Sequence, residues 1–536
     1  MRRVNTRLGD PAVAPRVEPP GASDRGRRRA VHRILAGIVV LAVVIGVVLR
    51  FVTRSDLWLD EALSVNIARL PLGDIPDALR RDGAPPLYYV LLHLWMEVFG
   101  EGDVAVRALS GVFSVATLPA VYFAGKRLGG RAGSWIAVVL LATSPFAIRY
   151  ATEARMYALV MFLVAWGYLA LVRALERPSL GRLAVVALVT AALLYTHSWS
   201  FYLVGVVGLL LIALGWRSPD AARRHAGWRV LIALVVGGIA YLPWVPTLLD
   251  QLAKTGTPWG EARLPWSGLM DAFDGLGGVS GPIHGEALFL RSVLVVLTFL
   301  GVFALGTSAR RMEIDLRTQP IVRWEALVAF ATLAVGLTLS WASGTAFQSR
   351  YASVVVPLLL LVVTAGVVAF RGRAARGGVL VAVVVLGLAG GVRAAVDERT
   401  QAGRVAEIIA ARARPGDVVL YCPDQLGPAT HRILGDDNGL VEMTFPDLRR
   451  PELVNWIDYR ERIAATDPDT VARRVVDRAG DATVWFVAMP GYRSVDGKCE
   501  ALGAALAALR GSGVQHVEPE ETAFYEPMGL VELPGR

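Results

Sequence analysis

The segment ILAGIVVLAVVIGVVLRF, residues 34–51, is an almost unbroken apolar run, and SDLWLDE, residues 55–61, follows it closely. The run is long enough for an α-helix to cross the hydrocarbon core of a membrane. It is too long for the apolar part of a typical signal peptide and lacks a small-residue cleavage site, so it predicts an uncleaved first span. Asp60 and Glu61 therefore lie just past a membrane helix, where ionisable groups are costly unless they have a function.

The rest of the chain repeats this apolar pattern. Of its 536 residues, 54% are apolar, and the mean hydropathy is +0.48, above that of an ordinary soluble domain. The pattern predicts a polytopic α-helical membrane protein, since a β-barrel would show short alternating segments instead. About eleven runs have the length that a membrane span requires. They fall near residues 34–52, 104–125, 133–149, 155–173, 182–198, 201–215, 229–249, 288–308, 325–342, 351–370 and 377–395.

The basic residues predict how these spans are oriented. The net charge is +9, and the arginines gather in six segments that all fall on one side of the membrane if there are eleven spans. This pattern is typical of cytoplasmic loops and argues against nucleic-acid binding. The N-terminus is predicted to be cytoplasmic and the C-terminus extracytoplasmic. The segments contain Arg2 to Arg29, Lys126 to Arg131, Arg173 to Arg182, Arg217 to Arg229, Arg310 to Arg323 and Arg371 to Arg376.

Composition divides the chain into three parts. Residues 1–33 are polar and predict a disordered cytoplasmic tail. Residues 34–396 form the predicted transmembrane domain, with outer loops at 53–103 and 250–287. Residues 397–536 turn polar and predict a small extracytoplasmic α/β domain. Its expected elements are helix 401–412, strand 417–421, helix 466–478, strand 483–488 and helix 500–510.

Several kinds of cofactor site have no sequence signal. No glycine-rich phosphate loop opens a helix in 397–536, so nucleotide binding there is not expected. The two cysteines, Cys422 and Cys499, form no metal-binding motif. An extracytoplasmic position would permit a disulfide between them, but the sequence leaves their pairing open. No cofactor is expected, and the need for a divalent metal is left open. Abundant Ala, Val, Gly and Arg with little Lys indicate a bacterial protein, hence a multi-pass protein of the bacterial plasma membrane.

Two interpretations fit the acidic pair. In the first, Asp60 is the N-cap of a helix from Glu61 to Leu70, and Glu61 is favoured in its first turn. In the second, a partly desolvated carboxylate at the membrane boundary acts as a general base on an acceptor hydroxyl. The two are compatible, because a cap would fix the carboxylate in place.

A second polar cluster lies between the third and fourth predicted spans, in RYATEARMY, residues 149–157. Glu153 and Tyr157 are four residues apart and are predicted to share a helix face. Arg149 or Arg155 can form a local ion pair with Glu153. The alternative is a site for an anionic ligand, since the planar guanidinium fork suits phosphate.

Further polar residues recur at the outer ends of the spans. His197 closes the fifth span after Tyr195 and Thr196, and Arg350 and Tyr351 open the tenth. Each has an ordinary interfacial interpretation, but together they predict a polar floor beneath the outer loops. His284 and Glu286 in the second loop are candidates to contact this floor.

Five short motifs carry a resemblance to a known family. They are Leu57-Trp58-Leu59-Asp60-Glu61, Pro85-Pro86-Leu87-Tyr88-Tyr89, Glu153-Ala154-Arg155-Met156-Tyr157, Tyr195-Thr196-His197 and Arg350-Tyr351. Over about residues 34–370, the chain resembles the bacterial glycosyltransferase family 39 group. These are GT-C fold enzymes related to protein O-mannosyltransferases and the lipid A aminoarabinose transferase. Many relatives carry His before the Pro-Pro pair where this chain has Ala84, which puts a role or metal contact at that position in doubt.

The resemblance implies a polyprenyl-phosphate sugar, such as the mannose derivative, as donor. It implies an inverting displacement with Asp60 as base and with Glu61 or Glu153 positioning acceptor or donor. Arg155, Tyr157 and Arg350 become candidates to bind the donor phosphate. Tyr88, His197 and Tyr351 are further candidates for substrate binding. The expected acceptor is a glycolipid, glycan or protein of the cell envelope.

Physical chemistry agrees with a lipid-linked donor. No nucleotide-sugar pool exists outside the cell, and a phosphate leaving group needs charge neutralisation rather than a proton. A lipid-linked sugar transporter is the rival, but it would place charged groups at mid-membrane depth and show repeat symmetry, neither of which is visible. A catalytically inactive assembly protein is a second rival, against which the intact Asp60-Glu61 pair argues.

Overall fold

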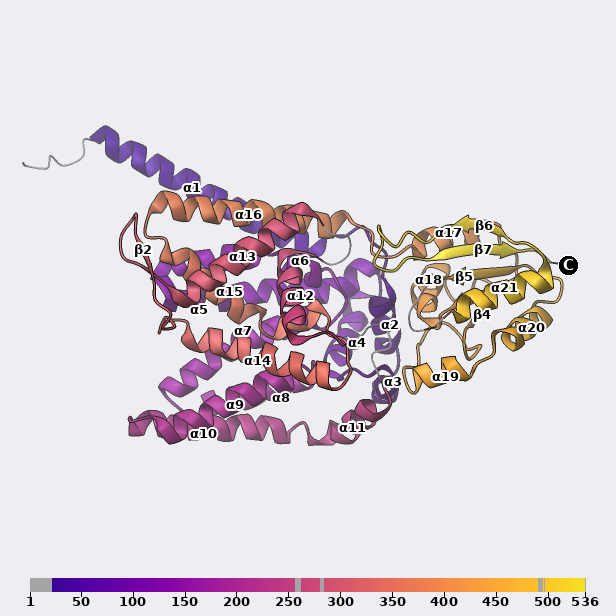
Figure 1. Ribbon diagram of the computed structural model, residues 1–536, viewed down its shortest axis with the longest axis horizontal. Helices are drawn as coiled ribbons and strands as arrows, with labels where there is room; N and C mark the ends of the chain where they lie inside the picture. Colours follow the sequence, from indigo (N-terminus) through magenta and orange to yellow (C-terminus); the bar gives the residue numbers. More distant parts are fainter. Residues whose placement is uncertain (1–21, 256–261, 280–283, 490–494, 496, 536) are drawn as a thin grey trace, which may run out of the picture.

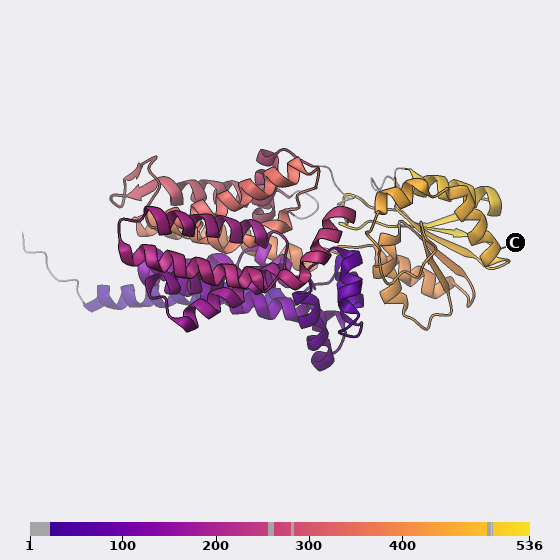
Figure 2. The same ribbon diagram turned by 90° about the horizontal axis from the view of Figure 1, so that it is seen from below.

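The computed structural model describes residues 22–255, 262–279, 284–489, 495 and 497–535. Two parts lie end to end: a long bundle of helices, and a smaller part built around a β-sheet at the C-terminal end of the chain (Figure 1). The view from below shows the same division (Figure 2). We call the smaller part the C-terminal sheet region, residues 397–535.

The bundle consists of long apolar helices that lie side by side. Many expose large apolar side chains outward, such as Leu188 and Leu209, which suits helices that face lipid rather than water. Their bounds are α1 (Ala22–Val48), α5 (Asp103–Ala142), α7 (Tyr157–Glu176), α8 (Leu180–Leu194), α9 (Ser200–Arg217), α10 (Ala221–Ile239), α13 (Gly285–Phe303), α14 (Arg323–Ala342), α15 (Val356–Ala369) and α16 (Arg373–Val396).

Within the described residues, seven helices are long and apolar enough to cross a membrane. They lie in Asp103–Ala142, Tyr157–Glu176, Ser200–Arg217, Ala221–Lys254, Gly285–Phe303, Arg323–Ala342 and Arg373–Val396. Shorter apolar helices occupy Ala36–Phe51, Leu87–Phe99, Leu180–Leu194 and Val356–Ala369. A multi-pass helical protein is therefore confirmed, whereas the number of eleven spans stays a prediction.

Two sequence-based boundaries are wrong, and a third is confirmed. The predicted tail 1–33 is too long, because α1 begins at Ala22; residues 1–21 lie outside the described part of the chain. The predicted span 133–149 is broken, because α5 ends at Ala142 and α6 (Pro145–Ala151) starts a new helix. The Ser144 side chain caps α6 by accepting a hydrogen bond from the backbone N–H of Ala147. The predicted turn between the second and third spans is confirmed, because Gly129 and Gly130 leave the helical conformation inside α5, with a φ of +58° at Gly130. The two halves of α5 fold back on each other there, since the backbones of Gly125 and Gly133 lie in close contact.

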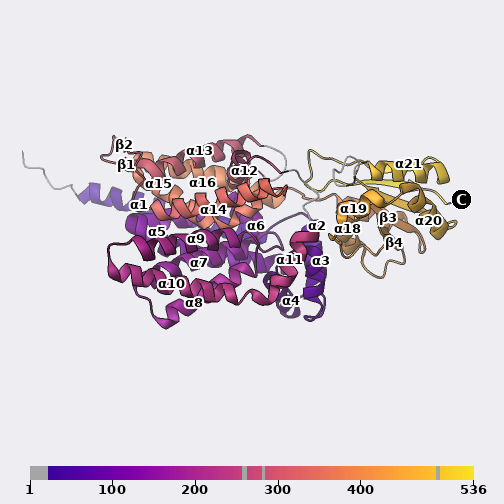
Figure 3. The ribbon, with the colours of Figure 1, turned by 60° about the horizontal axis from the view of Figure 1, so that its bottom comes forward.

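Short helices cover the end of the bundle that faces the sheet region, as Figure 3 shows for α2, α3 and α11. We call this the α2 end. Its elements are η1 (Leu49–Phe51), α2 (Leu59–Ala68), α3 (Ile75–Asp82), α4 (Leu87–Phe99), η2 (Leu242–Trp244), α11 (Val245–Lys254), α12 (Pro265–Gly277) and η3 (Ser349–Val354). At the opposite end lies a small antiparallel hairpin, β1 (Ala304–Gly306) with β2 (Met312–Ile314), whose turn contains two arginines of a predicted basic segment.

The C-terminal sheet region has a five-stranded sheet of order β4-β3-β5-β7-β6. β3 (Val418–Cys422) pairs in parallel with β4 (Val441–Thr444) and β5 (Val484–Ala488), while β7 (Gly529–Leu533) runs antiparallel to β5 and β6 (Val514–Val517). The predicted strands are β3 and β5, which are buried along their whole length and read as continuous apolar runs. The helices are α17 (Ala402–Arg412), α18 (Gly427–Leu434), α19 (Tyr459–Ala465), α20 (Pro468–Ala479) and α21 (Lys498–Arg510), with η4 (Asp424–Leu426).

Cys422 and Cys499 form a disulfide. It joins the end of β3 to the first turn of α21 across 77 residues of sequence. The structure thus answers the question of pairing that the sequence left open.

The sheet region is docked on the α2 end by contacts at several separate places. The backbone N–H of Trp456 donates to the carbonyl of Arg81 at 3.1 Å, and that of Asp458 donates to the carbonyl of Lys254 at 3.0 Å. On another side, Arg432 of α18 forms a 2.8 Å ion pair with Asp103 at the start of α5. These contacts hold the two parts in a defined orientation, so the sheet region takes part in shaping the α2 end.

Candidate active site

The acidic pair lies in the first turn of α2, at the α2 end of the bundle. α2 begins at Leu59, and Trp58 occupies the N-cap position. The expectation that Asp60 caps a helix starting at Glu61 is therefore wrong. Asp60 lies inside the helix, where a carboxylate is still favoured by the helix dipole.

Glu61 is fully buried and completely engaged by positive groups. Its two oxygens accept hydrogen bonds from Arg107 Nε at 2.7 Å and Arg107 Nη2 at 2.6 Å. The backbone N–H of Ala154 donates to Oε1 at 2.9 Å, and Arg399 Nη1 lies 3.4 Å from Oε2. Burial disfavours the charged form, but Arg107 and these other donors outweigh it and hold the pKa of Glu61 below its ordinary value. The geometry gives Glu61 the function of holding α2, α5 and the 152–155 turn together.

Asp60 has a different environment, because it faces two arginines and keeps some access to solvent. Its Oδ2 lies 3.3 Å from Arg350 Nη1 and 3.6 Å from Arg155 Nη2, and its side chain is 17% exposed. Within the described residues, no donor meets this oxygen with hydrogen-bond geometry, although it is buried. Asp60 Oδ2 is therefore held by charge attraction to the two arginines while its hydrogen-bonding capacity is not filled.

The two arginines also keep unused hydrogen-bond donors. Arg155 Nη1 donates to Ser64 Oγ and to the Tyr89 hydroxyl, each at 3.1 Å. In the described part of the chain, the Nε atoms of Arg155 and Arg350 are buried without a hydrogen-bond partner. Unsatisfied buried donors are costly, and a bound anion would satisfy them.

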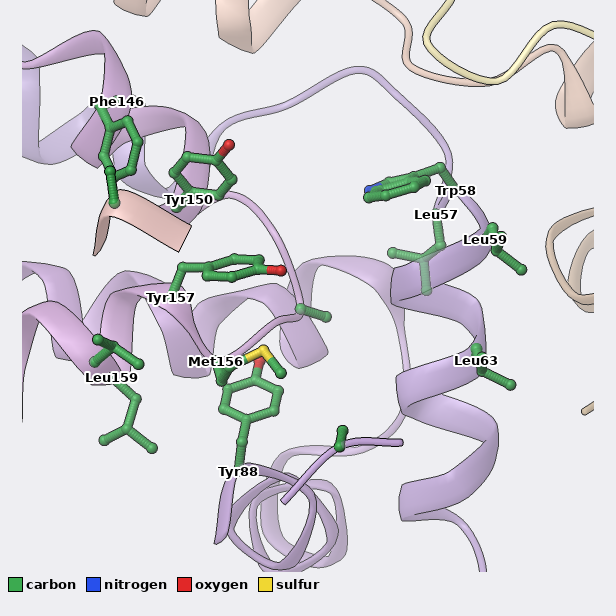
Figure 4. Close-up of a cluster of buried hydrophobic side chains, with 14 of the residues drawn as sticks. Leu57, Trp58, Leu59, Leu63, Tyr88, Phe146, Tyr150, Met156, Tyr157 and Leu159 are labelled. Carbon is green, nitrogen blue, oxygen red and sulfur yellow. The ribbon is translucent and has the colours of Figure 1, made fainter. Parts of the chain in front are cut away.

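Aromatic rings enclose this charged group. The Tyr157 ring lies 5.0 Å from that of Tyr150 and 5.7 Å from that of His197, and His197 lies 5.5 Å from Tyr351. Figure 4 shows Tyr150 and Tyr157 pointing toward Trp58 of the 57–59 segment. The Trp58 ring stacks on the guanidinium of Arg350 at 5.5 Å.

The structure thus brings together most of the predicted site residues: Asp60, Arg155, Tyr157, His197, Arg350 and Tyr351. His197 Nδ1 accepts a hydrogen bond from the backbone N–H of Trp199 at 3.1 Å, which places its proton on Nε2 in a neutral ring.

Two predicted site residues, Tyr88 and Glu153, are buried and make their polar contacts with residues other than Asp60. Tyr88 is fully buried, and its hydroxyl lies 3.0 Å from Ser110 Oγ, which bonds to the backbone carbonyl of Arg155. Glu153 forms the local ion pair with Arg149, at 3.0 Å, that was one of its two interpretations. The expectation that Glu153 and Tyr157 share a helix face is wrong, because α7 begins only at Tyr157.

Two candidates from the second loop lie elsewhere. Glu286 and His284 contact Arg393 of α16, at 2.7 and 3.4 Å, and not Asp60. One group in the described residues has the composition of a metal site: His431, Asp436 and Glu452 in the sheet region. Arg450 already bridges its two carboxylates, at 3.7 Å from Asp436 and 2.5 Å from Glu452.

Sequence reasoning missed several residues that shape the site. The sequence did contain a pattern that could have identified Arg107, because a charged residue at the start of an apolar run requires a partner. Arg399, Tyr525 and Glu526 had none, because they lie in the sheet region, more than 300 residues from the acidic pair.

Comparison with known proteins points to one class. Residues 83–244 match the family model described as dolichyl-phosphate-mannose-protein mannosyltransferase. The apo crystal structure of ArnT from Cupriavidus metallidurans is 15% identical, with a TM-score of 0.59, covering 94% of this chain and 100% of that one. ArnT from the same organism bound to undecaprenyl phosphate is 14% identical, with a TM-score of 0.54, covering 93% of this chain and 99% of that one. No curated protein sequence matches significantly.

The protein therefore has the GT-C fold of membrane glycosyltransferases. Its likeness to ArnT extends over nearly the whole chain, and the family match falls on the segment that contains Arg155 and His197. The GT-C fold that the sequence motifs predicted is therefore confirmed.

Proposed function

We propose that this protein transfers a sugar, mannose or a related one, from a polyprenyl-phosphate donor to an acceptor of the cell envelope. The acceptor is a glycolipid, a glycan or a protein on the extracytoplasmic side of a bacterial plasma membrane. Asp60 is the general base, and Arg155 and Arg350 bind the donor phosphate. Glu61 and Glu153 act as positioning residues, since both are buried in ion pairs.

The observation that carries this proposal is the position of Asp60 between Arg155 and Arg350. Asp60 lies within ion-pair distance of both guanidinium groups. Among the described residues, its Oδ2 and the Nε atoms of the two arginines have no hydrogen-bond partner. One anion and one hydroxyl are the partners that this arrangement lacks. A phosphate-linked sugar and an acceptor alcohol supply both.

The reaction is a single displacement at the anomeric carbon. The acceptor oxygen attacks the carbon while its proton passes to Asp60. The bond between the anomeric carbon and the phosphate oxygen breaks, and polyprenyl phosphate leaves as an anion. Arg155 and Arg350 neutralise the charge that develops on that phosphate, and the anomeric configuration inverts.

The similar proteins support this choice of donor. One of the ArnT structures contains undecaprenyl phosphate, and the matching family model describes enzymes that use dolichyl-phosphate mannose. Both ligands are polyprenyl phosphates, which a site at the end of a helical bundle can receive from the bilayer.

The test is direct transfer of label. The purified full-length protein is incubated with radiolabelled polyprenyl-phosphate sugars and a membrane extract, and the products are separated from the donor. We expect label to enter a product covalently, and Asp60→Asn is the inactive control. Movement of the intact donor across vesicles without formation of a product would instead identify a transporter and overturn the proposal.

A further inference from the structure

The helix that carries Asp60 lacks a cap of its own. The N-cap position of α2 is Trp58, which makes no side-chain capping bond. The first N–H groups of a helix have no partner inside the helix, so an acceptor must come from elsewhere. Glu526 supplies it from the sheet region: its Oε1 accepts a hydrogen bond from the backbone N–H of Leu59 at 3.2 Å.

The neighbouring residue contacts the other side of the site. The rings of Tyr525 and Trp58 meet edge to face, with their centroids 4.9 Å apart and their planes at 86°. Trp58 in turn stacks on Arg350 at 5.5 Å. Tyr525 is 42% exposed and also lines a pocket beside Arg149 and Arg399, so its ring borders open space rather than the core.

The backbone around these two residues is held firmly. The N–H of Glu526 donates to the carbonyl of Arg399 at 2.8 Å, and the N–H of Gln401 donates to the carbonyl of Glu526 at 3.1 Å. The buried side chain of Gln401 accepts from the N–H groups of Glu520 and Met528, each at 2.9 Å. The segment therefore acts as a fixed support and not as a loose tail.

The protonation state of Glu526 is also consistent with a positioning function. Burial, together with the negative charges of Asp60 and Glu61, raises the pKa of Glu526 to about 8. A neutral carboxyl still offers its carbonyl oxygen to Leu59. Glutamine is then a close mimic of the native side chain, whereas alanine removes the acceptor.

We propose that Glu526 and Tyr525 are positioning residues of the active site, through which the C-terminal sheet region holds Asp60 and Arg350 in place. Glu526 fixes the first turn of α2, and Tyr525 fixes Trp58 beneath Arg350. The catalytic part of the inference rests on the proposed function of Asp60 and Arg350, while the structural part can be measured without any substrate.

Hydrogen–deuterium exchange of the full-length protein tests the first contact. In Glu526→Ala, the peptide that covers residues 57–64 should exchange about fivefold faster, as expected for loss of a helix cap. Glu526→Gln should exchange like the wild type, and so should Glu521→Ala, a matched change at an exposed residue of the same segment. Unchanged exchange in Glu526→Ala would overturn the proposal.

Transfer of labelled sugar distinguishes an effect of Glu526 on catalysis from a purely structural effect. Glu526→Ala should lower kcat about tenfold, and Glu526→Gln should restore it, because a positioned base loses rate when it is misplaced. Full activity of Glu526→Ala despite faster exchange would show that the contact is structural only. No transfer by the wild type, together with faster exchange in Glu526→Ala, would reject the proposed function but not the contact.

Tyr525 gives an independent test that does not depend on the folding of Glu526→Ala. Because its side chain is partly exposed, Tyr525→Ala is expected to fold. It should weaken binding of undecaprenyl phosphate several-fold, whereas Tyr525→Phe should bind like the wild type. Equal affinity of Tyr525→Ala and wild type would remove Tyr525 from the site.

Discussion

Asp60 and Glu61 are neighbours in the chain, but their side chains have different functions. One step along an α-helix turns the side chain by about 100°. Glu61 therefore points to Arg107 and Arg399, where both of its oxygens are engaged. Asp60 points to Arg155 and Arg350, and its Oδ2 has no hydrogen-bond partner in the part of the chain that the structure describes. The choice of base rests on this difference.

Replacing Asp60 by Asn should reduce sugar transfer by about a hundredfold to ten-thousandfold, the usual contribution of a general base. Asn has the same shape but cannot take the proton, so the protein should still fold and bind undecaprenyl phosphate. Turnover in a reconstituted assay and lipid binding measure the two effects. Wild-type turnover of this variant would exclude Asp60 from the mechanism.

Replacing Arg155 or Arg350 by Ala should weaken donor binding. Loss of a charge-assisted contact to phosphate costs roughly 1.5–3 kcal/mol, or about a tenfold to hundredfold loss of affinity. Lys should restore only part of it, because the guanidinium fork is lost. Titration with a polyprenyl-phosphate lipid checks this, and unchanged affinity in both Ala variants would place the phosphate site elsewhere.

At the scale of elements, α2 is held by ion pairs that cross long stretches of sequence. The Glu61–Arg107 pair joins α2 to α5, and Arg399 joins both to the start of the sheet region. Arg399 also donates to the carbonyl and the hydroxyl of Thr152, each at 2.7 Å. One buried network of opposite charges thus holds α2 against α5 and the start of the sheet region.

Removing one partner of this network should destabilise the protein more than removing an exposed charge. Arg107→Ala leaves Glu61 buried without its main partner, which costs about 3–5 kcal/mol. Arg80→Ala, which breaks an exposed pair with Asp77 in α3, should cost less than about 1 kcal/mol. Thermal unfolding in detergent compares the two variants. Equal melting temperatures would contradict the structural function of the Arg107 pair.

The raised pKa of Glu526 predicts how stability depends on pH. A carboxyl whose folded-state pKa lies at about 8, above its ordinary 4.5, binds its proton more tightly in the folded state. Its contribution to stability is therefore lost as pH rises from about 4.5 to 8 and is constant above that range. Asp60 and Glu61 face this group and raise its pKa, while bonds from Leu59 and Thr400 oppose them.

Glu526→Gln removes this titration. Relative to the wild type, the variant should become more stable as the pH is raised from 5 to 9. Melting temperatures at the two pH values give the measurement, with Glu521→Ala as the control that should follow the wild type. A constant difference between wild type and Glu526→Gln would show that Glu526 does not titrate in this range.

At the scale of the whole molecule, the two parts depend on each other. The α2 end is completed by residues of the sheet region, and the sheet region is docked on α2, α3, α5 and α11. All of these contacts require both parts to lie on the same side of the membrane. The side itself, extracytoplasmic by the distribution of arginines, stays a prediction.

An impermeant protease tests this side. Added to intact spheroplasts, it should cleave residues of the sheet region, and unreduced samples should keep fragments linked through Cys422 and Cys499. Cleavage only after lysis would place the sheet region in the cytoplasm. It would also remove the physical argument for a lipid-linked donor.

Composition and periodicity predict the helical membrane class and most helices of the bundle, because burial in lipid requires apolar runs of fixed length. These patterns also predict strands β3 and β5 of the sheet region, and they place Asp60, Arg155, Tyr157, His197 and Arg350 at predicted span ends. These properties depend on local composition and periodicity, which the chain displays directly.

The difference between the engaged Glu61 and its neighbour Asp60 follows from contacts between distant segments. Glu61 looks as available as Asp60 in the sequence, because Arg107 and Arg399 lie 46 and 338 residues away. The contribution of Tyr525 and Glu526 was invisible for the same reason: the docking of the sheet region brings them to α2 from the far end of the chain. Contacts between distant segments depend on packing geometry, and no local pattern records them.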